Sequence, residues 1–247
     1  MIQDAPVSFT KRVVAIGIGA LLFVGLILSG MIMEKVDANE VLVVQDALDG
    51  ELHWYTSPGL KPQWFGRTTT FPKVVSYAFE GPIRFNEGGH GKVSGSVQFR
   101  LPLDPENLTD IYTAYSSASA LQSGLLSVVT DKSIFMTGPL LSSTESYAEK
   151  RSNLIFWIED QIVNGVYRTT RRDLKIKDPI TGEGKTATIA EIAMDAGQHP
   201  QRQETSQLSN FGITSFNFAV AEVQYDEIVE KQIAAQQSNI MAVQTAV

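Results

Sequence analysis

Histidine is the residue type in this chain best suited to holding a metal ion, and its spacing does not favour a site. The three histidines are His53, His90 and His199, far apart in the sequence. None belongs to an H-x-x-x-H or H-x-x-E-H pair, the spacing that places two ligands on one face of a helix. His90 lies in Gly88-Gly-His-Gly91, which is either a loop of a site or a turn, and the turn is the better interpretation.

The motifs of nucleophilic and phosphate chemistry are also missing from the sequence. The chain has no cysteine, which excludes disulfides, thiolate zinc sites, iron–sulfur clusters and cysteine nucleophiles, and it has no G-x-S-x-G elbow. Gly184-Lys-Thr186 resembles the end of a phosphate-binding loop, but Pro179 stands where that motif needs a glycine. Adjacent carboxylates such as Glu159-Asp160 face different directions on a helix and are typical of a solvated surface. We therefore expect no catalytic residue, cofactor or metal, and a protein that is not an enzyme.

One local group of residues is aromatic. Around Pro58-Gly59 the sequence places Trp54, Tyr55, Trp64 and Phe65. Indole and phenol rings favour the headgroup region of a bilayer, where the ring is in apolar surroundings and the N–H or O–H stays hydrated. One hypothesis is that the four side chains form a membrane-interface loop. The other, equally well supported, is that they fill the core of a small domain.

The charge balance excludes one class of partner. Among 247 residues, 20 Lys and Arg stand against 27 Asp and Glu, so the formal net charge is −7. A protein that binds nucleic acid through its phosphates normally has the opposite balance, so we expect no nucleic-acid partner. Charged residues at 19% and aromatics at 9% are typical of a folded chain. Because the net charge is negative, contact with membrane lipids should be chiefly apolar.

An uncharged apolar run, Val13–Met33, precedes these features. At about 1.5 Å per residue a helix of this length reaches the roughly 30 Å of a bilayer's hydrocarbon core, which predicts a transmembrane helix. A cleaved signal peptide is the alternative, but its apolar core is shorter and ends at small residues. Lys11 and Arg12 before the run favour a cytoplasmic N-terminus. We therefore expect a single-pass protein of the cell (inner) membrane with its main domains on the far, extracytoplasmic side.

The remainder alternates between two kinds of pattern. Residues 34–102 predict β structure, with the apolar run Glu40–Val44, the turn pair Asp49-Gly50 and alternating apolar residues around Val97. Residues 103–224 predict helices and strands together. Asp104 is suited to cap a helix that begins at Pro105, and Ser142 and Glu145 form a capping box. The helix that begins at this capping box continues to Asn164-Gly165. A hairpin around residues 174–189 and a strand over 213–220 follow.

A heptad-like helix closes the chain from about residue 226. Its apolar residues follow a 4-3 pattern through Val229, Ile233, Ile240 and Val243, with Gln236 as a polar position. The sequence ends inside this pattern, so we expect the natural chain to continue. An apolar seam of this kind is best buried against copies of itself, which makes the four residues candidates for oligomerisation.

These patterns predict an α+β protein with five segments. They are a short tail (1–12), a transmembrane helix (13–33), a β-rich first domain (34–102), an α+β second domain (103–224) and the beginning of a coiled-coil helix (225–247).

The order of these parts resembles the SPFH or band 7 family, which includes stomatins, prohibitins and flotillins. The likeness covers most of the chain beyond Val36 and rests on Val36-Asp-Ala-Asn-Glu-Val-Leu-Val-Val44, Ser57-Pro-Gly-Leu60-Lys-Pro62, Thr70-Phe-Pro72, the series Leu154, Ile158, Ile162 and Gly165, and Phe211-Gly-Ile-Thr-Ser-Phe216 before the heptad helix. The chain departs from the family pattern in a longer region Tyr167–Leu208 and in a very short coiled-coil arm.

The resemblance implies a non-enzymatic membrane scaffold. Such proteins assemble into rings or cages with copies of themselves or with a related SPFH chain, organise a lipid and protein microdomain, and modulate access to an AAA+ membrane protease. Two alternatives stay open: a stomatin-like direct regulator of a channel or transporter, and a membrane-tethered hydrolase. The first would form a small defined complex, and the second needs a cleft with paired carboxylates or clustered histidines.

Overall fold

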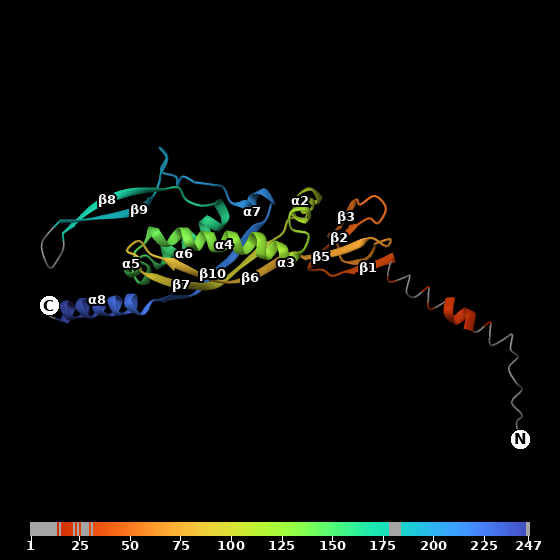
Figure 1. The fold of residues 1–247 in the computed structure, drawn as a ribbon, viewed down its shortest axis with the longest axis horizontal. Helices are drawn as coiled ribbons and strands as arrows, with labels where there is room; N and C mark the ends of the chain where they lie inside the picture. The colour runs from red at the N-terminus through yellow and green to blue at the C-terminus, as the bar shows by residue number, and fades with distance from the viewer. Residues whose placement is uncertain are drawn as a thin grey trace, which may run out of the picture. The chain divides into compact units, whose positions relative to one another are not determined.

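The computed structural model describes residues 14, 16–21, 23, 25, 30, 32–177 and 184–245. The fold is α+β, and the chain divides into two compact units, Met1–Pro72 and Lys73–Val247 (Figure 1). Each unit is described by itself.

The transmembrane helix expected over residues 13–33 was a wrong prediction. Among the described residues no helix is both long and apolar enough to cross a membrane. Crossing takes about 20 consecutive apolar residues in one helix. Met33, the last residue of the apolar run, instead begins strand β1 (Met33–Val36). Residues 13, 15, 22, 24, 26–29 and 31 of the run lie outside the described part of the chain.

The first unit is built from short antiparallel strands. In one sheet β2 (Glu40–Gln45) pairs with β3 (Leu52–Tyr55) and with β5 (Arg67–Pro72); in another, β1 pairs with β4 (Gly59–Pro62). The predicted apolar run is the central strand β2, whose residues 41–44 are all buried. Burial on both faces explains why that strand is continuously apolar rather than alternating.

The second unit is organised around a three-stranded antiparallel sheet in the order β10-β7-β6. Its strands are β6 (Val74–Arg84), β7 (His90–Arg100) and β10 (Thr214–Tyr225). Because β10, near the end of the chain, pairs with β7, the strands over 74–100 belong to the second unit. The boundary between units therefore lies after Pro72 and not at residue 102, where the change from strand to helix pattern suggested it.

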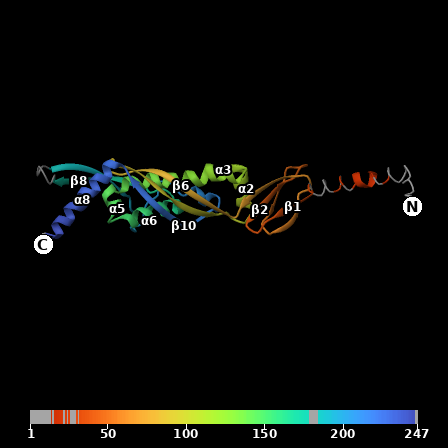
Figure 2. The same ribbon diagram turned by 90° about the horizontal axis from the view of Figure 1, so that it is seen from below.

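Helices cover one face of this sheet. They are α2 (Pro105–Tyr115), α3 (Ala118–Leu121), α4 (Ser127–Thr137), α5 (Ser143–Tyr147), α6 (Arg151–Asn164) and α7 (Gln207–Asn210), with a π-helical turn at Gln122–Leu126 and a 3-10 turn, η2, at Gly138–Leu140. Helix α4 packs on β6 and on α6, which also contacts β10 (Figures 1 and 2). The caps predicted at Asp104 and at Ser142 with Glu145 are confirmed. The helix predicted after Ser142 is interrupted at residues 148–150, where the Lys150 N–H turns back to the Glu145 carbonyl.

A two-stranded ribbon and a final helix complete the second unit. The ribbon consists of β8 (Thr169–Lys177) and β9 (Gly184–Ile192), which pair in antiparallel register. It agrees with the predicted hairpin, whose tip at residues 178–183 lies outside the described part. Helix α8 (Glu227–Thr245) continues from β10 and leads away from the sheet (Figures 1 and 2).

Candidate functional site

One end of the first unit gathers exposed apolar side chains. The strand register brings the start of β1, the β2–β3 turn and the β4–β5 turn to the same end, because Met33 pairs with Pro62 and Gln45 with both Leu52 and Arg67. At this end Met33, Leu48, Trp64 and Phe65 are 40%, 97%, 64% and 51% exposed, respectively. We call these four residues the apolar end. Large apolar side chains that are exposed together mark an interaction surface rather than a stable core.

The Trp64–Phe65 turn has an unfavourable backbone. Trp64 has φ 45° and Phe65 has φ 66°, and the Gly66 N–H donates to the Gln63 carbonyl at 2.7 Å. Both central residues are therefore left-handed, as in the type I′ turns for which Asn-Gly is favoured. The left-handed conformation costs an ordinary L-residue about 1–2 kcal/mol. Two bulky aromatic residues that are both strained and exposed are not explained by stability of the fold.

Hydrogen bonds attach this turn to the end of the N-terminal apolar run. The Gln63 and Trp64 N–H groups donate to the Ile32 carbonyl at 2.8 and 3.4 Å, respectively. The buried Gln63 side chain donates through Nε2 to the Gly30 carbonyl at 2.7 Å. A Cβ added to Gly66 would lie 2.6 Å from the Gln45 carbonyl oxygen, so the backbone approach there requires glycine. The turn is thus held in one position beside the apolar run.

The structure divides the four predicted interface aromatics into two pairs. Trp54 is half-buried with its ring centroid 6.4 Å from that of Phe71, and Tyr55 packs against the core cluster of Val36, Leu42 and Val44. Trp64 and Phe65 are instead exposed at the apolar end. The core hypothesis therefore describes Trp54 and Tyr55, which contribute to packing, but not Trp64 and Phe65, which are exposed.

Leu48 at the apolar end was not a sequence candidate. It lies in the turn after β2, where its N–H donates to Oδ1 of Asp46 at 2.8 Å, and its side chain is almost fully exposed. A leucine within Asp46-Ala-Leu-Asp-Gly50 departs from the polar composition of most turns. That departure is the signal that would have revealed it.

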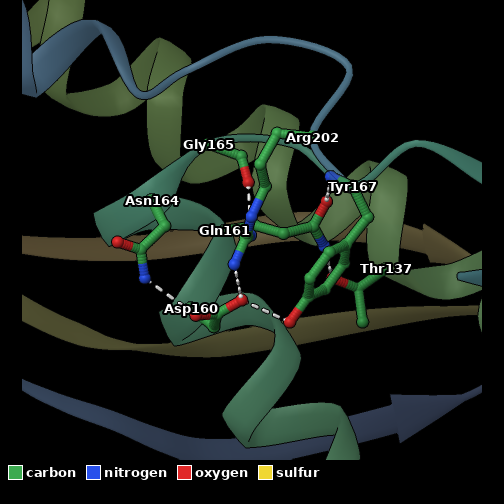
Figure 3. A network of polar contacts seen from close by, with 7 residues as sticks. All are labelled: Thr137, Asp160, Gln161, Asn164, Gly165, Tyr167 and Arg202. Atoms are coloured by element: carbon green, nitrogen blue, oxygen red, sulfur yellow. Dashed lines mark hydrogen bonds and ion pairs between the residues drawn. The ribbon is translucent and has the colours of Figure 1, made fainter. Parts of the chain in front are cut away.

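The second unit contains a cluster of hydrogen-bonded polar side chains that includes Asp160, Tyr167 and Arg202 (Figure 3). Asp160 on α6 accepts hydrogen bonds from Asn164 Nδ2 at 2.8 Å, from Arg202 Nη2 at 2.6 Å and from the Tyr167 hydroxyl. Arg202 also donates to the Gly165 carbonyl at 2.7 Å, and its guanidinium carbon lies 4.4 Å from the centroid of the Tyr167 ring. Both carboxylate oxygens are therefore engaged.

The neighbouring amide completes the cluster. Gln161 Nε2 donates to the Thr137 hydroxyl at 2.6 Å, and Gln161 Oε1 accepts from the Tyr167 N–H at 3.1 Å (Figure 3). Burial alone raises the pKa of Asp160, but the hydrogen bonds from Tyr167, Arg202 and Asn164 outweigh it and hold that pKa below its ordinary value. Burial and the adjacent carboxylate raise the pKa of Tyr167 above its usual range. The cluster connects α4, α6 and the segment after β9 by hydrogen bonds, so it holds these three segments together.

The structure places the oligomerisation candidates in two groups. Val229 and Ile233, in the first half of α8, are buried at 4% and 7% exposure. A Cβ added to Gly89 would lie 2.9 Å from Val229, and Ile233 lines a groove with residues of α5. These two residues therefore contact their own unit. The side chains of Ile240 and Val243 lie outside the described part.

In the part of the chain that the structure describes, no group of three or more His, Asp or Glu side chains is placed to hold a metal ion. No family model matches the chain, and no curated protein matches its sequence.

Proposed function

We propose that this protein is a non-enzymatic scaffold that lies on a membrane through its apolar end and assembles with copies of itself. The assembly would organise a patch of lipid and protein and limit the access of an AAA+ membrane protease to its substrates. The part played by the protease rests on the SPFH resemblance. The membrane contact rests on the exposed, strained Trp64–Phe65 turn, which is the observation that carries the proposal.

The surroundings of that turn support a lipid partner. Leu48 and Met33 extend the apolar surface, and the carbonyls of Gly30 and Ile32 tie the turn to the N-terminal apolar run. Described side chains of that run, including Ile16, Leu21 and Phe23, are also exposed. An apolar surface that includes an indole is suited to the headgroup region of a bilayer. Asp46 and Asp49 beside Leu48 make a strongly anionic surface a poor partner.

Other features support assembly without catalysis. Among the described strands, β6 and β10 each pair on one side only, so each leaves an edge that a neighbouring chain could cover. In the Asp160 cluster both carboxylate oxygens accept hydrogen bonds from side chains of the protein, so this group is not offered to a substrate. These observations favour a role carried out by surfaces.

Fluorescence of single-tryptophan variants tests the membrane contact in the full chain. The chain has three tryptophans, Trp54, Trp64 and Trp157. The variant W54F/W157F keeps only Trp64, and W54F/W64F keeps only Trp157 on α6 as the matched control. In vesicles that contain brominated lipid, we expect Trp64 emission to be quenched several-fold more strongly than Trp157 emission. Equal quenching, or stronger quenching of Trp64 by aqueous acrylamide than by the lipid, would contradict the contact.

Particle size in mild detergent tests the assembly. We expect the full-length wild-type chain to run as a particle many times the 27.1 kDa of one copy. A monomer at micromolar concentration would contradict the scaffold role, whatever the result with lipid.

A further inference from the structure

The β8–β9 ribbon is a two-stranded sheet of its own. Among the described strands, β8 and β9 pair only with each other. An isolated pair of strands is at best marginally stable in water, and it gains stability when another surface covers it. Figure 1 shows the ribbon running along the helical side of the second unit, where β9 contacts η2.

The root of the ribbon is firmly held. The Arg168 N–H donates to the Gln201 carbonyl, and the Ala193 N–H donates to the Arg168 carbonyl, both at 2.8 Å. Arg202, in the segment after β9, stacks on Tyr167 and pairs with Asp160. Because the root is ordered in a single copy, binding through the ribbon would cost little additional ordering there.

The ribbon is basic in an acidic chain. Residues 168–177 contain five basic residues and one acidic residue, although the whole chain has a net charge of −7. Arg168 and Arg171 are exposed, and in the described part of the chain neither forms an ion pair. Arg172 pairs with Glu191 at 3.1 Å. The start of the ribbon, with Arg168 just before β8 and Arg171 within it, thus presents two guanidinium groups that form no ion pair with a described carboxylate.

A groove with the opposite charge lies between α5 and α8. It has a volume of about 180 Å³ and is lined by Thr144, Glu145, Tyr147, Ala148, Glu149, Ile233 and Gln237. Lys150 pairs with Glu145, and Lys231 pairs with Glu227. Glu149 forms no ion pair among the described residues, and neither does Glu230, one turn before Ile233 on the same face of α8. The groove lining therefore includes Ile233 and the carboxylate of Glu149, and Glu230 lies next to it on α8; neither carboxylate pairs with a described cation.

We propose that the basic ribbon of one copy docks in the acidic α5–α8 groove of the next copy. The inference rests on the proposed self-assembly and names the surfaces that produce it. Both surfaces belong to one chain, and no ion pair joins them within the described part of a single copy. A contact between two different surfaces of identical chains is head-to-tail, and repetition of it produces a ring when the rotation closes.

The experiment compares charge-reversed full-length chains by particle size in mild detergent. R168E/R171E reverses the ribbon, and E149K/E230K reverses the groove. R67E/R84E makes the same change in charge at exposed positions outside both surfaces and is the matched control. We expect each of the first two variants to lose the large particle and the control to keep it. Thermal unfolding should stay close to that of the wild type in all three.

Mixing the two reversed variants is the decisive arm. In the mixture the reversed ribbon of R168E/R171E meets the reversed groove of E149K/E230K, and the unchanged ribbon of the second variant meets the unchanged groove of the first. Both contacts join opposite charges, so we expect large particles to return. Raising the salt concentration should disperse wild-type particles, because exposed charges are screened.

The outcomes separate this inference from the proposed function. Wild-type chains that stay monomeric contradict the scaffold itself. Wild-type particles that persist in R168E/R171E, or mixtures that do not reassemble, overturn the ribbon–groove contact and leave the scaffold standing. Particles that persist while R168E/R171E loses binding to phosphatidylglycerol vesicles would also overturn it, because the ribbon would then serve lipid.

Discussion

Trp64 and Phe65 combine local strain with exposure, and their type alone did not reveal this. The sequence placed them in one group with Trp54 and Tyr55, because spacing cannot tell which ring lies on the core side of a strand. The difference depends on the Ile32 carbonyl, which receives the Gln63 and Trp64 N–H groups from a distant part of the chain. Tertiary hydrogen bonds of this kind are not visible in a local pattern.

Replacing both residues with the dipeptide preferred by the turn should separate stability from function. We expect W64N/F65G to raise the free energy of unfolding by about 1–2 kcal/mol, because Asn and Gly adopt the left-handed conformation readily. The same variant should lose most of the membrane contact that the Trp64 and Phe65 side chains contribute, measured by exchange of the protein between vesicles. F156S, which removes an exposed aromatic side chain from α6, is the control and should leave that exchange unchanged. A destabilised W64N/F65G chain would contradict the strain argument.

Asp160 should make stability depend on pH in the acidic range. Its pKa is lower in the folded chain than in the unfolded chain, so its stabilising contribution is complete above about pH 4 and is lost as the pH falls through the folded value. We expect D160N to lower the free energy of unfolding by on the order of 2 kcal/mol at pH 7, since it leaves the half-buried Arg202 without its anion. The difference from wild type should shrink at pH 3.

Urea denaturation at the two pH values measures this difference. D110N, at an exposed position on α2, is the control and should change little at either pH. A D160N effect of equal size at pH 7 and pH 3 would show that the carboxylate's charge is not its source.

At the scale of elements, capping residues were the most informative part of the sequence. Asp104, the capping box at Ser142 and the glycine after Asn164 each mark a helix end that the structure contains. The hairpin was predicted, but its basic first strand was given no role, because the sequence does not show which acidic surface the strand could contact. The groove between α5 and α8 could not be predicted, because it needs two segments about 90 residues apart to meet.

Helix α8 should show two different effects along its length. Ile233 is buried against its own unit, so I233D should lower the free energy of unfolding by about 2–3 kcal/mol. Ile240 and Val243 continue the heptad pattern, and we expect I240D/V243D to reduce particle size without changing the thermal midpoint. Calorimetry and size measurement on the same samples distinguish the two. If I233D alone changed only particle size, the burial of Ile233 would not describe the chain in solution.

The whole molecule combines two units that the sequence divided in the wrong place. A change from strand pattern to helix pattern near residue 102 suggested a boundary, yet β6 and β7 belong with β10, a pairing between segments about 120 residues apart. Sequence periodicity reports local structure and does not report which distant strand completes a sheet. The apolar N-terminal run was likewise interpreted by length and composition alone, whereas its last residue belongs to a strand.

The link between Gln63 and Gly30 has a mechanical consequence. One buried side chain joins the last part of the N-terminal apolar run to the turn that precedes β5. This hydrogen bond couples the backbone at Gly30 to the turn, so a tilt of the chain at Gly30 would be transmitted to β5 and, through its pairing, to the central strand β2. Under the proposed membrane contact, bending of the membrane would therefore strain the pairing between β2 and β5.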